Sequence, residues 1–166
     1  MREISEETYL GVNDFICGLN KDQLKEFHRR MKEKQPNLHD FFICHILFET
    51  NQKILLSFNS IFALIIRSYE YEYGEFPILK KDRLVNFHHN KSKQIVEELK
   101  LNSREKILSD LRTQAGQSEL ISFIDLIVDG TLEKPSPYSV LQKSDVKFGI
   151  YLAIIFLNQE MEIINN

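Results

Sequence analysis

Histidine side chains are the groups in this sequence best suited to acid–base or metal chemistry near neutral pH. The chain has five of them. His39 is followed directly by Asp40, and His45 stands four residues before Glu49, so that on a helix the second pair shares one face. A catalytic zinc needs three protein ligands and a bound water, and neither pair supplies a third ligand. We therefore interpret these histidines as partners of neighbouring polar groups, and we predict neither a metal nor a cofactor.

A second arrangement joins Arg83 to His88, five residues later, in a segment with helical periodicity. This spacing resembles the motif of the HEPN ribonucleases, which are small all-helical domains. The resemblance implies that the two side chains face one cleft at a dimer interface. The histidine would then assist proton transfer at the ribose hydroxyl, and the arginine would stabilise charge on the phosphate. Leu84 stands where that family prefers a polar residue.

The sequence lacks the GxGxxG, GxxxxGK[ST], HExxH and CxxC motifs that hold nucleotides or zinc. Its net charge of −3 disfavours general affinity for nucleic acid, because such affinity needs a basic surface. The charge is uneven, since residues 80–106 carry eight basic and four acidic side chains. We interpret this region as solvated helix faces, and a basic face on the folded protein is the alternative.

The elements that position these residues are predicted to be helices, because apolar residues recur at helical spacing and glycine and proline number only six and four. We predict an all-α fold: one domain over residues 1–166, built as a compact bundle of roughly six to eight helices. Two segments, at about 52–73 and 145–162, are apolar nearly all round and are predicted to be central helices lying side by side. Residues 131–143 are predicted to be a loop. The helix that opens at Asp82 is expected to break near Asn90.

Several aromatic residues lie next to predicted loops, where such side chains often act as interface anchors. They are Tyr69, Tyr71, Tyr73, Phe76 and Tyr138. We predict that they form a binding surface. The alternative is that Phe76 and its neighbours only fix a loop to the core.

Two functional hypotheses follow from these patterns. The first is a non-enzymatic protein-interaction module (an adaptor, a regulator or an immunity-type binder) with a protein partner, and homodimer formation is compatible with it. It is favoured because the sequence has no catalytic constellation. The alternative is a HEPN-like ribonuclease or RNA-binding domain that uses Arg83 and His88.

The sequence also bears on cellular location. Its longest apolar run, residues 54–66, is too short to span a membrane, and serine and asparagine interrupt it. The first residues lack the apolar core of a signal peptide. We therefore predict a cytoplasmic protein that makes no membrane contact.

Overall fold

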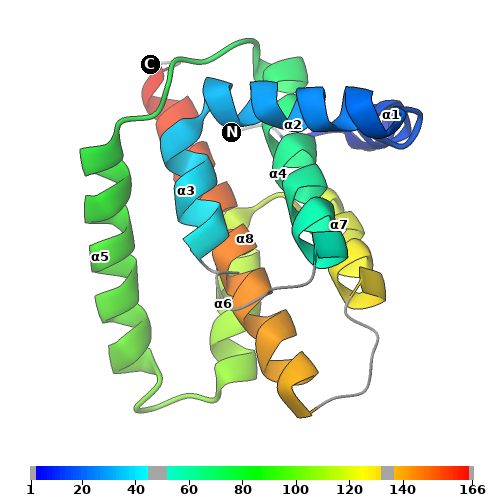
Figure 1. Ribbon diagram of the computed structural model, residues 1–166. Helices are drawn as coiled ribbons and strands as arrows, with labels where there is room; N and C mark the ends of the chain where they lie inside the picture. Colours follow the sequence, from blue (N-terminus) through cyan, green and yellow to red (C-terminus); the bar gives the residue numbers. More distant parts are fainter. Residues whose placement is uncertain (1–2, 45–51, 132–136, 165–166) are drawn as a thin grey trace.

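Eight α-helices make up the part of the chain that the computed structural model describes, namely residues 3–44, 52–131 and 137–164 (Figure 1). No strand occurs within these residues. The prediction of an all-α bundle is confirmed. In chain order the helices are α1 (Glu6–Cys17), α2 (Lys21–Lys34), α3 (Pro36–Cys44), α4 (Gln52–Tyr73), α5 (Lys81–Glu98), α6 (Arg104–Ala115), α7 (Ser118–Thr131) and α8 (Pro137–Ile164).

Side-chain caps fix where the first two helices begin. The Ser5 side chain accepts a hydrogen bond from the backbone N–H of Thr8 at 3.3 Å. At α2, the Asn20 side chain accepts from the backbone N–H of Gln23 at 3.1 Å, and the Gln23 side chain accepts from the backbone N–H of Asn20 at 2.9 Å. These reciprocal bonds satisfy amide groups that have no partner within the helix. The short connection between α1 and α2 therefore ends one helix and opens the next.

The two predicted central helices, α4 and α8, supply much of the buried core. All side chains of residues 61–66 in α4 and 150–157 in α8 are buried. α4 packs mainly against α1 and α2, whereas α8 packs against α3, α6 and α7, and α7 also touches α4. α4 and α8 meet through the hydroxyl of Tyr69, which donates to Oδ1 of Asn158 at 2.5 Å. Their contact is thus made by side chains that reach across the core, and the prediction that the two helices lie side by side was wrong, because α1, α2 and α7 are the main neighbours of α4.

Two predicted boundaries were wrong. α8 begins at Pro137, inside the stretch 131–143 that we predicted to be a loop. Proline suits the first turn of a helix because the N–H that it lacks would have no partner there. α5 runs without a break through Asn90. Its packing against α3 and α8 outweighs the modest helix propensity of asparagine.

The end of α4 determines how the aromatic residues near it are oriented. The helix continues to Tyr73 and stops before Gly74, whose φ of 85° lies in the left-handed region that glycine tolerates.

Figure 1 shows α5 along one edge of the bundle and α1 and α7 on the opposite side. None of the helices, over the residues described, is long and apolar enough to cross a membrane.

Candidate functional site

A groove between α1 and the C-terminal half of α4 is lined by two exposed aromatic side chains and an exposed glycine. Its volume is about 460 Å³. Because α1 packs directly on α4, the groove has two continuous helical walls. We call it the α1/α4 groove, and its described lining residues are Glu7, Thr8, Gly11, Val12, Phe15, Arg67 and Tyr71.

The amphipathic pattern of α1 explains why small and aromatic residues line this groove. Tyr9, Val12 and Ile16 are buried and form the face that packs into the bundle. Gly11 and Phe15 are four residues apart and therefore share another face of the same helix. This face borders the groove, and both residues are exposed there.

The two exposed rings of the groove are each held by a neighbour. Phe15 is 54% exposed, and its ring meets that of Phe27 of α2 edge to face at a centroid distance of 5.5 Å. Tyr71 is 71% exposed, and the guanidinium of Arg67 lies over its ring, 5.7 Å from the centroid. Aromatic side chains that are fixed before binding lose little conformational entropy when a partner covers them.

Polar contacts link α1 to α4 beside the groove and orient the side chain of Arg67. Thr8 Oγ1 donates to Glu72 Oε2 at 3.2 Å, which links α1 to α4. Arg67 Nη1 donates to Glu70 at 2.8 Å, and Lys34 Nζ donates to the same carboxylate at 2.6 Å. The bond to Glu70 raises the pKa of Lys34. The described lining residues include no histidine, cysteine or serine.

The five predicted aromatic anchors do not form one surface. Tyr71 is exposed, as an anchor must be, but Tyr69 is completely buried and bonded to Asn158. Burial raises the pKa of the Tyr69 hydroxyl well above its usual value. Within the folded chain Tyr69 is therefore a core residue that a partner cannot reach.

Of the other three predicted anchors, the structure describes the side chains of two. Tyr73 and Phe76 are half-buried and pack against the core, so the interpretation of a loop fixed by Phe76 agrees with its contacts. Tyr138 falls in the first turn of α8, and its side chain lies outside the described residues. Sequence reasoning found Tyr71 but missed Gly11 and Phe15, which α1 brings to the same groove.

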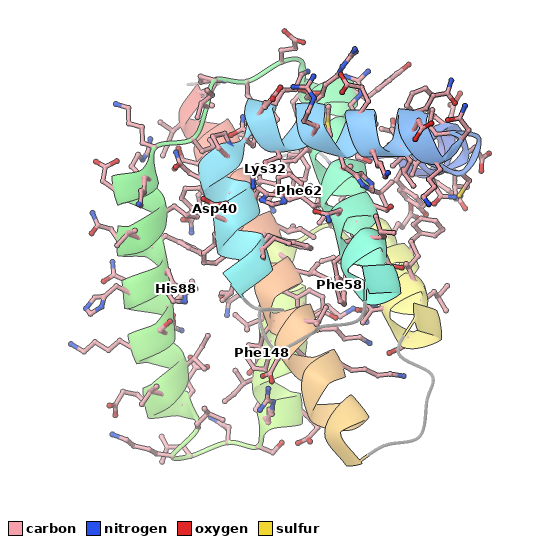
Figure 2. The ribbon with its side chains drawn as sticks, in the orientation of Figure 1. Lys32, Asp40, Phe58, Phe62, His88 and Phe148 are labelled. Atoms are coloured by element: carbon pink, nitrogen blue, oxygen red, sulfur yellow. The ribbon has the colours of Figure 1, made fainter. Side chains whose placement is uncertain are left out.

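Arg83 and His88 have different partners in the folded chain. Arg83 Nη2 forms an ion pair with Glu160 Oε1 of α8 at 2.9 Å. Burial raises the pKa of the Glu160 carboxyl, and the charge of Arg83 partly offsets this. His88 Nε2 lies 3.3 Å from the Ser92 hydroxyl, and its ring meets that of Phe41 of α3 at 5.4 Å. Figure 2 shows His88 on the side of α5 that faces α3 and α8.

His88 does border a cleft, which lies between α5 and α8 and has a volume of about 320 Å³. Arg104 and Asp145 form an ion pair there, and the Arg104 guanidinium lies 5.4 Å from the centre of the Phe148 ring. Arg83 is not among the described residues that line this cleft. Within one chain the structure therefore does not bring Arg83 and His88 to a shared site.

Two other histidines are held by neighbouring polar side chains. His39 is buried between α3 and α4, edge to face with Phe62, and its Nε2 lies 3.1 Å from Asn59 Oδ1. His28 Nε2 lies 3.1 Å from the Ser60 hydroxyl. Burial, and secondarily the nearby His39, lowers the pKa of His28. The described residues contain no group of three metal-ligating side chains, and the predicted pair His45 and Glu49 lies outside them.

A polar network that sequence reasoning missed joins α6, α7 and α8. The Tyr151 hydroxyl donates to the Asp125 carboxylate, with oxygen distances of 2.8 and 2.9 Å. Lys147 Nζ lies 3.5 Å from Asp125 and 3.0 Å from Asp129, and Arg112 Nε lies 3.6 Å from Asp125. The sequence does contain a signal for this network. Asp125 and Asp129 are four residues apart, as are Lys147 and Tyr151, so each pair lies on one face of its helix.

Comparison of the chain with models of protein families, with curated proteins and with solved structures found no match.

Proposed function

We propose that this protein is a non-enzymatic protein-interaction module and that a partner protein binds in the α1/α4 groove. The observation that carries this proposal is that two exposed aromatic side chains, Phe15 and Tyr71, line the same groove as Gly11. Aromatic side chains near the centre of a contact often supply most of its binding energy. The ribonuclease alternative has no comparable support, because Arg83 is engaged with Glu160.

Gly11 needs an explanation, because glycine inside a helix costs about 0.5–1 kcal/mol relative to alanine. Its φ is not positive, so the backbone conformation does not require glycine. A Cβ atom built on Gly11 meets nothing within 4 Å, so packing inside the chain does not require it either. A helix or strand of a partner that approaches α1 closely at this point would account for the missing side chain.

The first test places a larger side chain at Gly11, in the lining of the α1/α4 groove. Gly11→Leu adds a side chain to open space and improves helix propensity, so the fold should persist. The added side chain should weaken partner binding at least about tenfold, because it occupies open space in the groove that Phe15 and Tyr71 also line. The measurement is quantitative mass spectrometry of proteins retained from a lysate of the source cells on the immobilised wild type and variant.

Gly130→Leu is the matched control, since Gly130 is also helical and exposed, and its built Cβ also meets nothing within 4 Å. Gly130 lies near the end of α7 and does not line the α1/α4 groove. A protein retained by the wild type and by Gly130→Leu, but lost from Gly11→Leu, would support the proposal. Equal retention by all three chains would contradict it.

A further inference from the structure

A second groove lies on the other side of α1, where that helix meets α7. Its volume is about 400 Å³. Leu10 and Leu126 are exposed at 36% and 72%, and Phe123 is half-buried and packs against the core. The two leucines lie on different helices and line the same groove, so they form an exposed apolar strip. No described residue covers this strip. We call this region the α1/α7 groove.

The rim of the α1/α7 groove is acidic on both sides. Glu6 stands in the first turn of α1 and Glu119 in the first turn of α7, and both line the groove. Tyr9 lies between them. Its pKa is raised first by burial and then by the negative charges of Glu6 and Glu119, and all three side chains line the groove.

Among the described residues, two further charged side chains form hydrogen bonds to residues that line the groove. Glu3 adds a third carboxylate, which accepts hydrogen bonds from the N–H and the hydroxyl of Ser118 at 3.0 and 2.8 Å. The described residues that line the groove include no lysine or arginine. Arg112 touches it only through the Ser122 hydroxyl, at 2.7 Å, and lies 3.6 Å from Asp125 in the network with α8.

We infer that the α1/α7 groove binds a basic amphipathic helix of a partner protein. The leucines of such a helix, at positions three or four residues apart, would cover Leu10, Phe123 and Leu126. Its lysine or arginine side chains would reach Glu6 and Glu119 from the two edges of that strip. Nucleic acids and anionic membranes are disfavoured as occupants because the carboxylates repel phosphate groups. The inference rests on the proposed protein-binding function, but it concerns a different groove.

The test uses two synthetic helical peptides of about four turns. Both carry leucine at the same positions, and one carries lysine on the flanks where the other carries glutamate. Fluorescence anisotropy with the full chain should show that the lysine peptide binds at least about tenfold more tightly than the glutamate peptide, and that added salt weakens its binding. Equal binding of the two peptides would overturn the inference.

Variants then locate the site. The double variant Glu6→Lys, Glu119→Lys should weaken binding of the lysine peptide at least about tenfold. The milder Glu6→Gln, Glu119→Gln should give an intermediate loss, and it covers the case in which lysine disturbs the two helix N-termini. Glu75→Lys, Glu97→Lys is the matched control, because it makes the same charge change at exposed side chains outside the groove. An equal loss in the control would mean that only net charge matters, which would overturn the inference.

Two further readouts separate this groove from the α1/α4 groove and from self-association. Gly11→Leu should bind the lysine peptide as the wild type does, so failure of the first proposal and failure of this inference can be told apart. Sedimentation velocity should show that the wild type has the same mass at all concentrations. If the wild type self-associates and the glutamate-to-lysine variant does not, the occupant is a second copy of the chain, and the inference is wrong.

Discussion

Replacing Leu157 by alanine is expected to lower the free energy of unfolding by about 2–5 kcal/mol. Leu157 is 0% exposed and lies in the run of α8 in which every side chain is buried. Alanine would lose the transfer free energy of three carbon atoms and would leave a cavity, because the helices that surround α8 are held by their own contacts. The loss follows directly from the placement of α8 at the centre of the bundle.

Leu126→Ala in α7 is the control, since it makes the same chemical change at a side chain that is 72% exposed. We expect it to change stability by no more than about 0.5 kcal/mol. Urea unfolding followed by far-UV circular dichroism measures both variants, with the slope of each transition checked against that of the wild type. Similar losses in the two variants would show that α8 is not the core helix described above.

The helices that form the core could be predicted because burial leaves a pattern in the sequence. Residues 54–66 are apolar on nearly every face, and the predicted helix 52–73 coincides with α4. The start of α8 could not be predicted in the same way, because Ser136, Pro137 and Ser139 read equally well as a loop. Tertiary contacts decide whether such a segment forms a loop or the first turn of a helix, and the local sequence does not show these contacts.

Part of the α1/α4 groove was predictable in principle. Once α4 is taken to continue to Tyr73, helical periodicity places Tyr69 and Tyr73 four residues apart on one face and Tyr71 on the other. Tyr69 is buried, and Tyr71 is exposed. Our prediction grouped the three residues because it treated them as neighbours of a loop, and a period-two pattern also fits that stretch.

The rest of the α1/α4 groove was beyond sequence reasoning. Gly11 and Phe15 are about sixty residues from Arg67 and Tyr71 in the sequence, and only the packing of α1 on α4 brings them together. The same holds for Asp125 and Tyr151, whose hydrogen bond depends on how α7 and α8 are aligned. Such sites depend on helix register, and one isolated sequence gives no information about register between distant segments.

The second large effect concerns alkaline pH. Burial raises the pKa of Tyr69 well above its usual value of 10.0, and burial together with Asp125 raises the pKa of Tyr151. Above pH 10 these hydroxyls lose their protons in the unfolded chain and keep them in the folded one. The folded state then binds more protons than the unfolded state, so the free energy of unfolding falls as pH rises. Each of the two tyrosines contributes up to about 1.4 kcal/mol per pH unit to this slope.

Tyr151→Phe separates this contribution from other alkaline effects. At neutral pH the variant should be less stable by about 1.5–3 kcal/mol, because Asp125 loses a hydrogen bond. Between pH 10 and 11, however, its stability should fall less steeply than that of the wild type, since phenylalanine has no proton to lose. Tyr71→Phe, at an exposed ring, should keep the wild-type slope. Urea midpoints measured at pH steps across this range test this prediction. If Tyr151→Phe and the wild type lose stability in parallel, burial and Asp125 do not hold the Tyr151 hydroxyl neutral in the folded protein.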